Sequence, residues 1–418
     1  MELKRYKLGN CLIMAENGVV IKQSKNAGGL PITRIETLSN DCFNRDKLGY
    51  ANIFDEKKYE HYILDDMDLI MSHINSRTFL GRTVIYRKRS DEKIIHGMNV
   101  LRIKTDNSIL NSIFAAYLFK TKYFKKCIDN IRKDAINQSS FALSDLKNIE
   151  IKIPTIEEQN EIAFTLQLLD NKISINKQIN DNLEAMAKQL YDYWFVQFDF
   201  PNEEGKPYKS SGGAMVWNEK LKREIPQEWS NGVLSDVANI TMGQSPDGSS
   251  YNENGEGIIF YQGSTDFGLR FPAVRQYTTS PSRYANKGDI LMSVRAPVGA
   301  LNIANNDCCI GRGLSALSSK IGSMTHLYYL MNDFRLKFEG MNSAGTTFGS
   351  ITKDELFNLP VVIPTKSIIS KFEKVCEPIF DKQMIIGEEI NALTKQRDEL
   401  LPLLMNGQAT VNYHLSAY

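Results

Sequence analysis

The sequence predicts an α+β protein built as an internal repeat, in which two globular modules of mixed strand and helix are each followed by a long helix. Apolar residues recur with heptad spacing in two segments, and the two heptad series fall in the same phase. The regions before these segments contain short apolar runs of β type, separated by Gly, Asn, Asp and Pro. The expected order is a first module at 1–154, a long helix at 155–197, a linker at 198–229, a second module at 230–364, a second long helix at 365–408 and a tail at 409–418.

Each long helix is expected to begin after a short apolar strand that ends in a proline, Pro154 or Pro364. A shift of 364 − 154 = 210 residues places the first heptad ladder on the second, position by position. A helix of nearly forty residues with one apolar seam needs a partner, and the other copy is the obvious one. The residues assigned to helix pairing are Ile162, Leu166, Leu169, Ile173, Leu183 and Leu190 in the first helix and Ile379, Ile386, Ile390, Leu393 and Leu400 in the second.

Polar residues interrupt both seams, at Asn176 and Asn180 in the first helix and at Gln383 and Arg397 in the second. One interpretation is a tolerated hydrated stretch. The other is that these residues fix the register of the two helices, because a buried polar residue can specify coiled-coil alignment at some cost in stability.

The two globular modules also match each other in sequence. The matching pairs are 68–72 with 289–293, 77–81 with 295–299, and 139–141 with 346–348. The separation between the copies drifts along the chain, as expected when loops between fixed strands change length.

The composition is that of a folded protein, with 42% hydrophobic and 24% charged residues. There is no apolar run of about eighteen residues that could span a membrane, and the first residues lack the apolar core of a signal peptide. None of the six cysteines forms a C-x-x-C pair, so they are interpreted as reduced thiols of a cytoplasmic protein. The net charge is +1, so any affinity for nucleic acid must come from local basic patches or from a partner.

Motifs of the common DNA-dependent enzymes are missing from the sequence. There is no G-x-x-x-x-G-K-[ST] phosphate loop, no G-x-G-x-x-G after a strand, and no N-P-P-[YF] element of an amino-methyltransferase. The five histidines show no metal-ligand spacing. We therefore assign no catalytic residue, no metal site and no cofactor to this chain.

Basic and hydroxyl side chains are instead the candidates for binding DNA, through phosphate contacts and through arginine readout of guanine edges. The candidate residues are Arg77, Arg82, Arg87, Lys88, Arg89, Ser139 and Ser140 in the first module and Arg275, Arg295, Arg312, Thr346 and Thr347 in the second. Arg77 and Arg295 stand out because they recur at the same place in both copies. The alternative for these two is a repeated structural salt bridge, to Asp68 and Asp289, and the alternative for the hydroxyls is capping of a helix or turn.

Several segments resemble the central conserved region of type I restriction–modification specificity subunits, the HsdS family. They are residues 154–163 (PTIEEQNEIA), 169–173 (LDNKI), 190–195 (LYDYWF), 198–201 (FDFP), 208–213 (YKSSGG) and 399–408 (ELLPLLMNGQ). The resemblance covers essentially the whole chain. In the second copy it weakens, because residues 366–370 (KSIIS) replace a Glu-Glu-Gln-like segment and Pro378 falls within the ladder. The proline predicts a kink or break near Glu377.

The resemblance implies a non-catalytic subunit that binds a split target in double-stranded DNA through two target recognition domains. Its long helices would pair as an antiparallel coiled coil and act as a ruler for the unread spacer. Two methyltransferase subunits and restriction–translocase subunits would join it, and these partners would use S-adenosylmethionine, ATP and Mg. The alternatives are a free-standing bipartite DNA-binding regulator or decoy, a coiled-coil scaffold without a DNA role, and an autonomous DNA enzyme, which the missing motifs disfavour.

Overall fold

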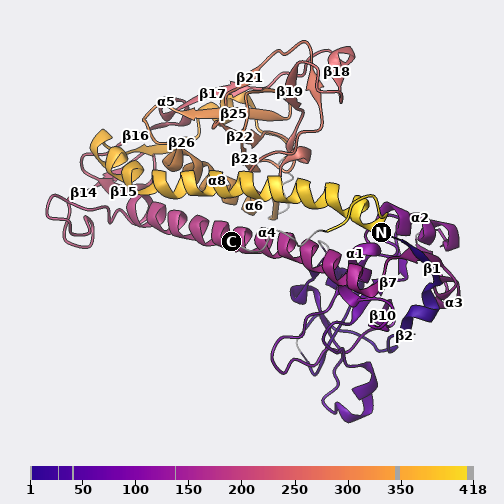
Figure 1. Cartoon of the computed structure of the whole chain (residues 1–418). Coiled ribbons are helices and arrows are strands. Elements are labelled where there is room, and N and C mark those ends of the chain that lie inside the picture. The colour runs from indigo at the N-terminus through magenta and orange to yellow at the C-terminus, as the bar shows by residue number, and fades with distance from the viewer. Residues whose placement is uncertain (1, 27, 40–41, 137, 344–348, 412–418) are drawn as a thin grey trace, which may run out of the picture. The chain divides into compact units, whose positions relative to one another are not determined.

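The computed structural model describes residues 2–26, 28–39, 42–136, 138–343 and 349–411. The chain forms two compact units (Figure 1). The first unit contains residues 1–173 and 392–418, and the second contains residues 174–391. Both long helices therefore contribute one part to each unit.

A four-stranded antiparallel sheet lies at the centre of the first unit. Its order is β2 (Leu12–Asn17), β10 (Val100–Thr105), β7 (Leu69–Ser72) and β9 (Thr83–Ile85). All four residues of β7 are buried, which explains why this strand reads as a continuous apolar run. The smaller sheets pair β1 (Lys4–Lys7) with β13 (Glu150–Ile153), β3 (Pro31–Ile32) with β6 (Gly49–Tyr50), β4 (Leu38–Ser39) with β5 (Cys42–Phe43), and β11 (Lys133–Asp134) with β12 (Ser139–Ser140) and β8 (Ile74–Asn75).

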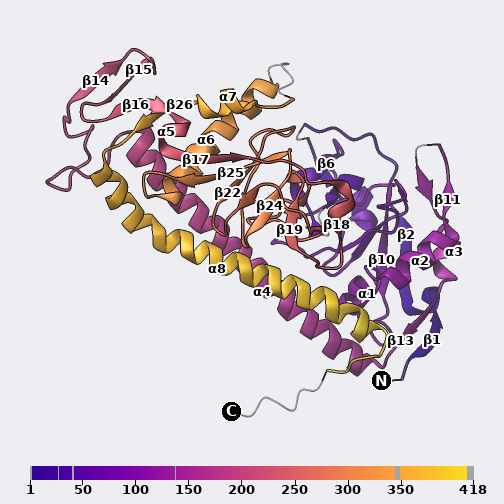
Figure 2. The same ribbon diagram turned by 90° about the horizontal axis from the view of Figure 1, so that it is seen from above.

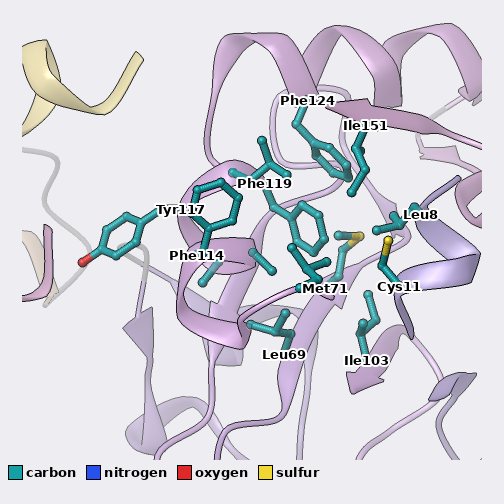
Figure 3. Packing of buried hydrophobic residues seen from close by; sticks show 14 of the residues in the cluster. Leu8, Cys11, Leu69, Met71, Ile103, Phe114, Tyr117, Phe119, Phe124 and Ile151 are labelled. Carbon is teal, nitrogen blue, oxygen red and sulfur yellow. The ribbon is translucent and has the colours of Figure 1, made fainter. Parts of the chain in front are cut away.

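Helices α1 (Ser112–Leu118), α2 (Lys122–Ile131) and α3 (Leu143–Lys147) cover this sheet. The Asn111 and Thr121 side chains cap α1 and α2 by accepting hydrogen bonds from backbone N–H groups of the first turn. Their apolar faces meet the sheet in one core, where Phe114, Phe119 and Phe124 lie over Met71 and Ile103 (Figure 3).

The second unit contains a four-stranded antiparallel sheet of the same order, formed by β17 (Ala238–Met242), β25 (Leu314–Ser319), β22 (Ile290–Ser293) and β23 (Leu301–Ile303). Helix α6 (Met324–Ser343) lies against it (Figure 2). The other elements are the pair β16 (Ser230–Val233) and β26 (Pro360–Ile363), the hairpin β14 (Met215–Asn218) and β15 (Arg223–Pro226), short helices α5 (Leu234–Val237) and α7 (Lys353–Phe357), and a sheet of β18 (Tyr251–Asn252), β20 (Tyr277–Thr278), β19 (Ile258–Tyr261), β24 (Cys308–Ile310) and β21 (Tyr284–Ala285).

The two modules share their strand topology, in agreement with the expected repeat. Ser72 of β7 pairs with Val100, and Ser293 of β22 pairs with Leu314 in the same register. The matched sequence segments 68–72 and 289–293 thus occupy equivalent central strands. The equivalence extends to the pairs β1–β13 and β16–β26, which close each module beside its long helix.

The long helices are α4 (Ile156–Tyr191), which continues into a π-helical turn at Asp192–Val196, and α8 (Lys366–Met405). Every position of the two heptad ladders is buried or half-buried. In the first unit, Leu404 and Met405 of α8 share a core with Ile162 and Leu166 of α4. In the second unit, Phe372 and Cys376 of α8 share an aromatic cluster with Ala187 and with Trp194 of the π-helical turn.

Helix α8 is not broken near Glu377, so the break that we expected there is wrong. The helix is continuous from Lys366 to Met405 and includes Pro378. Proline removes the N–H that would bond to the carbonyl of Lys374. Both Lys374 and Pro378 lie on the exposed face of the helix, where water can replace the missing donor.

The segment 198–229, which we expected to be a polar linker, packs through its aromatic residues. Phe198, Phe200 and Trp229 are buried in the aromatic cluster at the end of α4. The rings of Phe200 and Trp229 stack with centroids 5.0 Å apart. The polar and glycine residues that predict a turn-rich linker therefore alternate with aromatic residues that attach it to the second unit. No helix in the described part of the chain is long and apolar enough to cross a membrane.

Candidate nucleic-acid interface

Arg77 and Arg295 lie in the equivalent connections that follow the central strand of each module. The N–H of Gly81 donates to the carbonyl of Ser72 at 2.8 Å, and the N–H of Gly299 donates to the carbonyl of Ser293 at 2.9 Å. Both glycines have positive φ, +78° and +87°, a conformation that L side chains rarely adopt. The two connections therefore end alike at their glycines and both arginines are exposed, although the first connection is longer and strand register aligns Arg295 with Ile74.

The alternative role for these arginines, a repeated salt bridge to the preceding aspartate, is not what the structure contains. Asp68 accepts a 2.6 Å hydrogen bond from Nε of Arg102, a neighbour on β10, and both side chains are almost fully buried. In the second module Ala316 takes the place of Arg102, and Asp289 accepts from the backbone N–H of Asn286 at 2.8 Å.

The other basic candidates of the first module differ in exposure. Arg82 is half-buried, donates to the carbonyl of Leu38 at 3.1 Å and lies over the ring of Phe79, so part of its role is structural. The turn that follows β9 holds three exposed cations, which are Arg87, Lys88 and Arg89.

Glu92 stabilises this turn. It accepts a hydrogen bond from the backbone N–H of Arg89 at 2.8 Å and pairs with Arg45. The bond from Arg45, followed by the one from the Arg89 backbone, lowers the pKa of Glu92 to about 2. The carboxylate therefore stays charged, and the turn presents its cations from a fixed backbone, an arrangement that suits phosphate contacts.

Of the hydroxyl candidates, the structure describes the two serines of the first module, and both lie in the short strand β12. Ser139 is buried and donates to the Asp134 carboxylate at 2.6 Å, which lowers the pKa of that carboxyl. Ser140 is half-buried, in β12. The Ser139 hydroxyl is thus held by a side chain of the paired strand, which is neither a phosphate contact nor the capping of a helix or turn, so both expected roles of these serines stay predictions. Thr346 and Thr347 lie outside the described residues.

In the second module, Arg275 and Arg312 are both exposed. Arg275 is engaged with its own loop, since Nε lies 3.2 Å from Asp266 and Nη2 donates to the carbonyl of Thr265 at 2.9 Å. The side chain of Arg312 projects from a Gly-Arg-Gly turn, and its backbone N–H donates to the Ser245 hydroxyl at 3.3 Å.

Sequence reasoning missed the loop cluster around Arg312. We use this name for residues 243–245, 261–263 and 311–314. The backbones are so close that a Cβ on Gly243 would lie 2.2 Å from the carbonyl oxygen of Gly311. The Ser245 hydroxyl also bonds with the side-chain amide of Gln262. The glycines at 243, 263, 311 and 313, next to exposed polar residues, were the available signal.

The connection that carries Arg295 adjoins this cluster. The N–H of Val294 donates to the carbonyl of Gly313 at 2.9 Å, and Arg295 itself forms a backbone bridge with Ser350. The exposed side chains of Arg295 and Arg312 therefore belong to one edge of the second module. A polar edge with exposed arginines on a rigid backbone can bind phosphate and base edges.

The residues assigned to helix pairing are buried or half-buried, and two of the polar residues that interrupt their ladders, Gln383 and Arg397, form hydrogen bonds with α4. In the first unit, Asp170 of α4 accepts hydrogen bonds from Arg397 of α8 at 2.9 Å and from the hydroxyl of Tyr117 at 2.5 Å. Figure 3 shows this hydroxyl pointing away from the core. In the second unit, Gln383 of α8 donates to Glu184 of α4 at 2.8 Å.

Within the described residues, no group of three or more His, Cys, Asp or Glu side chains is arranged to hold a metal ion. Cys11, Cys308, Cys309 and Cys376 are buried free thiols, and burial raises the pKa of Cys376 to about 12. Thiols of raised pKa are poor nucleophiles near neutral pH.

Comparison with known proteins assigns a family. Residues 4–185 and 226–400 match the model of the type I restriction modification DNA specificity domain, so the match occurs twice in the chain. The putative type I restriction enzyme MjaX specificity subunit of Methanocaldococcus jannaschii is 35% identical over 97% of this chain and 93% of its own. The type I restriction enzyme MjaIX specificity subunit of the same organism is 29% identical over 72% and 69%.

A solved structure, the S subunit of a type I restriction-modification system from M. genitalium, covers 96% of both chains with a TM-score of 0.60. Its sequence identity is 16%, so this likeness concerns the fold. The duplicated topology, the repeated exposed arginines and the family match agree with one another. The chain belongs to the family of type I restriction–modification DNA specificity subunits.

Proposed function

We propose that this chain is the DNA sequence-specificity subunit of a type I restriction–modification complex, and that it binds a bipartite DNA target. The observation that carries the proposal is the duplication of one module topology, with an exposed arginine, Arg77 or Arg295, in the connection after the central strand of each copy. Two similar modules on one chain bind a split site as a bivalent ligand. When one module has bound its half-site, the other module is held at a high effective concentration near the second half-site.

The antiparallel coiled coil belongs to this proposal, with α4 and α8 as the spacer between the half-sites. Its support is the order of contacts inside each unit. Within the second unit, Glu184 contacts Gln383 whereas the later residue Trp194 contacts the earlier residue Phe372. Within the first unit, Asp170 contacts Arg397. Such an order is that of two helices running in opposite directions, and the polar contacts would oppose a shift in register.

The chemistry of the complex is assigned to partner subunits. Two methyltransferase subunits would use S-adenosylmethionine, and restriction–translocase subunits would use ATP and Mg. The support is the family membership, together with a sequence that lacks the phosphate loop and the amino-methyltransferase element. The complex would act in the cytoplasm, where its DNA substrate is.

The test is to express the chain together with methyltransferase subunits and to map N6-methyladenine at base resolution. We expect methylation at a split sequence with a fixed gap. Inserting one heptad into both α4 and α8 adds about 10 Å at 1.5 Å per residue, or about three base pairs of DNA, so the gap should lengthen by about that amount.

Heptads inserted into the tail after Gly407 serve as the control and should leave the gap unchanged. A gap that ignores the helix insertion would refute the spacer. The absence of any stable association with methyltransferase subunits, combined with retained DNA binding, would favour a free-standing regulator.

A further inference from the structure

The loop cluster of the second module has a counterpart in the first. Strand register aligns Gly18 with Gly243 and Gly97 with Gly311. A Cβ on Gly18 would lie 2.4 Å from the carbonyl oxygen of Gly97, and one on Gly243 would lie 2.2 Å from that of Gly311. In both modules, therefore, the same two backbone segments lie so close together that only glycine fits at the point of contact.

Hydrogen bonds confirm the alignment residue by residue. The N–H of Val19 donates to the carbonyl of His96 at 3.0 Å, and that of Gln244 donates to the carbonyl of Ile310 at 3.0 Å. Ile32 pairs in parallel with Ile95 as Phe260 does with Cys309. The aligned positions are Val20 with Ser245, Arg34 with Gln262, and Met98 with Arg312.

The aligned side chains differ in chemistry. In the second module Ser245, Gln262 and the exposed Arg312 are hydrogen-bonding groups. In the first module the position of Gln262 holds Arg34, which is half-buried and pairs with Glu36 at 3.4 Å. Val20 is 76% exposed and Met98 is 41% exposed, and the backbone N–H of Met98 donates to the carbonyl of Val19 at 3.1 Å. Neighbouring exposed apolar side chains are suited to contact with an apolar group of a partner.

The two surfaces match two features of the DNA major groove. Guanine presents O6 and N7, which a guanidinium binds with two parallel hydrogen bonds, and thymine presents a 5-methyl group that accepts apolar contacts. The glycines of the Gly-Arg-Gly turn let it pack against Gln262, since a Cβ on Gly311 or Gly313 would lie 2.9 or 2.7 Å from an atom of that residue. The bonds of Ser245 to Gln262 and to the N–H of Arg312 hold the turn in place, with the Arg312 side chain exposed.

We propose that the equivalent loop clusters read bases and that the two half-sites are read by different chemistry. Arg312 recognises a guanine in the half-site of the second module. Val20 and Met98 contact the methyl group of a thymine in the half-site of the first. This inference rests on the proposed function, and it adds to that function the residues and the base classes that set specificity.

The exposed arginines of the two connections then have a separate role. Arg295 lies beside the cluster because Val294 bonds to Gly313, and Arg77 lies in the equivalent connection of the first module, although not at the aligned position. Because this connection carries an exposed arginine in both modules whereas the clusters differ, these arginines suit what both half-sites share, the phosphate backbone.

The test selects sequences from a randomised duplex library with the complex of this chain and its methyltransferase subunits. Arg312→Lys keeps the charge but loses the two-pronged donor geometry. We expect this variant to lose preference for guanine at one position of one half-site and to leave the other half-site unchanged. Met98→Arg should bring a preference for guanine into the opposite half-site, with Met98→Leu as the matched control that keeps the wild-type preference.

Base analogues then test the atoms. Replacing that guanine with 7-deazaguanine removes one acceptor without disturbing base pairing, and we expect binding to weaken about 5- to 100-fold, as for loss of one good base contact. Replacing the thymine with deoxyuridine removes the methyl group and should weaken binding about 3- to 5-fold, the effect of one methyl-sized apolar contact. Neither analogue should affect the variant that lacks the corresponding side chain.

Two results would overturn the inference. In one, the wild-type complex selects a split sequence but the Arg312 and Met98 variants select the same sequence. In the other, Arg312→Ala weakens all sequences alike and lowers the salt dependence by about one ion, as a phosphate contact would. A wild-type complex that selects no sequence at all would instead refute the proposed function, and the inference with it.

Discussion

Arg102 and Asp68 form a buried ion pair in the first module that the second module lacks. Side chains of Arg102 and Asp68 are 4% and 2% exposed, and Nε of Arg102 lies 2.6 Å from Oδ2 of Asp68. Arg102 also donates to Asp65 at 2.8 Å and to the carbonyl of His61 at 2.8 Å. The equivalent of Arg102 in the second module is Ala316, so the two copies allow a comparison within one protein.

Arg102→Met should destabilise the first module by about 3–5 kcal/mol at pH 7, because it removes the hydrogen-bonded cation of the buried Asp68 carboxylate and leaves only the partly exposed Lys104, 3.9 Å away. Asp68→Asn should cost less, at the low end of this range, because Arg102 keeps the partly exposed carboxylate of Asp65. Asp289→Asn in the second module breaks no such pair and should cost about 1 kcal/mol, the value of one hydrogen bond.

The destabilisation caused by Arg102→Met should decrease as the pH falls. Burial raises the pKa of Asp68 above its ordinary value even beside Arg102. The folded protein therefore binds this proton more tightly than the unfolded chain does. As the pH falls toward the raised pKa, this group adds to the free energy of unfolding. The loss caused by Arg102→Met should therefore be smaller at pH 5 than at pH 7.

Hydrogen–deuterium exchange of the full chain, followed by mass spectrometry, measures the free energy of opening for peptides of β7 and β10. The same peptides in β22 and β25 serve as an internal control that should not change. The reasoning is refuted if Arg102→Met costs less than about 1 kcal/mol, or if it loosens both modules equally. A double-mutant cycle with Asp68→Asn should give a coupling of about 1–3 kcal/mol.

Three further predictions concern single sites. Arg397→Ala removes a partly exposed ion pair with Asp170 and should lower the free energy of unfolding in urea by about 1 kcal/mol. An unchanged free energy would contradict this prediction and mean that water fully replaces the pair. Gly243→Ala places a methyl group 2.2 Å from a backbone oxygen and should lower the free energy of exchange protection of β17 by about 1–3 kcal/mol. Gly248→Ala meets open space and should be neutral, so equal effects of the two substitutions would contradict the close approach. Burial lowers the pKa of His326 to about 3, so the unfolded chain binds this proton more readily, and this histidine should cost about 2 kcal/mol of stability between pH 7 and pH 5. Buried His96 contributes a loss of its own, so unfolding followed by tryptophan fluorescence should show a loss about 2 kcal/mol smaller in His326→Phe than in the wild type, and equal losses would contradict the assignment.

The long helices were the part of the fold that the sequence predicted best. Their periodicity depends on local geometry, because residues three and four apart share one face of a helix whatever surrounds it. The same reasoning overestimated the effect of Pro378, because α8 continues through this residue on its exposed face, where water can bond to the free carbonyl of Lys374. The solvent exposure of a helix face follows from the packing of the rest of the chain.

The candidate site was predicted unevenly. Arg77 and Arg295 recur in sequence and are exposed in equivalent connections, although strand register aligns Arg295 with Ile74. Ser139 also recurs, but its hydroxyl is bound by Asp134, a residue that contacts it through a short sheet. Repetition in sequence indicates a shared constraint and does not say whether the constraint is structural or functional.

By itself, the sequence determined the duplication, the two helical seams and the matched central strands, because these depend on residue spacing and on repeated local turns. The tertiary structure decided which charges are buried and which are exposed, as in the pairing of Asp68 with Arg102 in place of Arg77. It also aligned Val20 with Ser245 and Met98 with Arg312, across loops that differ in length and share no sequence. Such alignments follow from strand register, which is set by contacts between residues far apart in the chain.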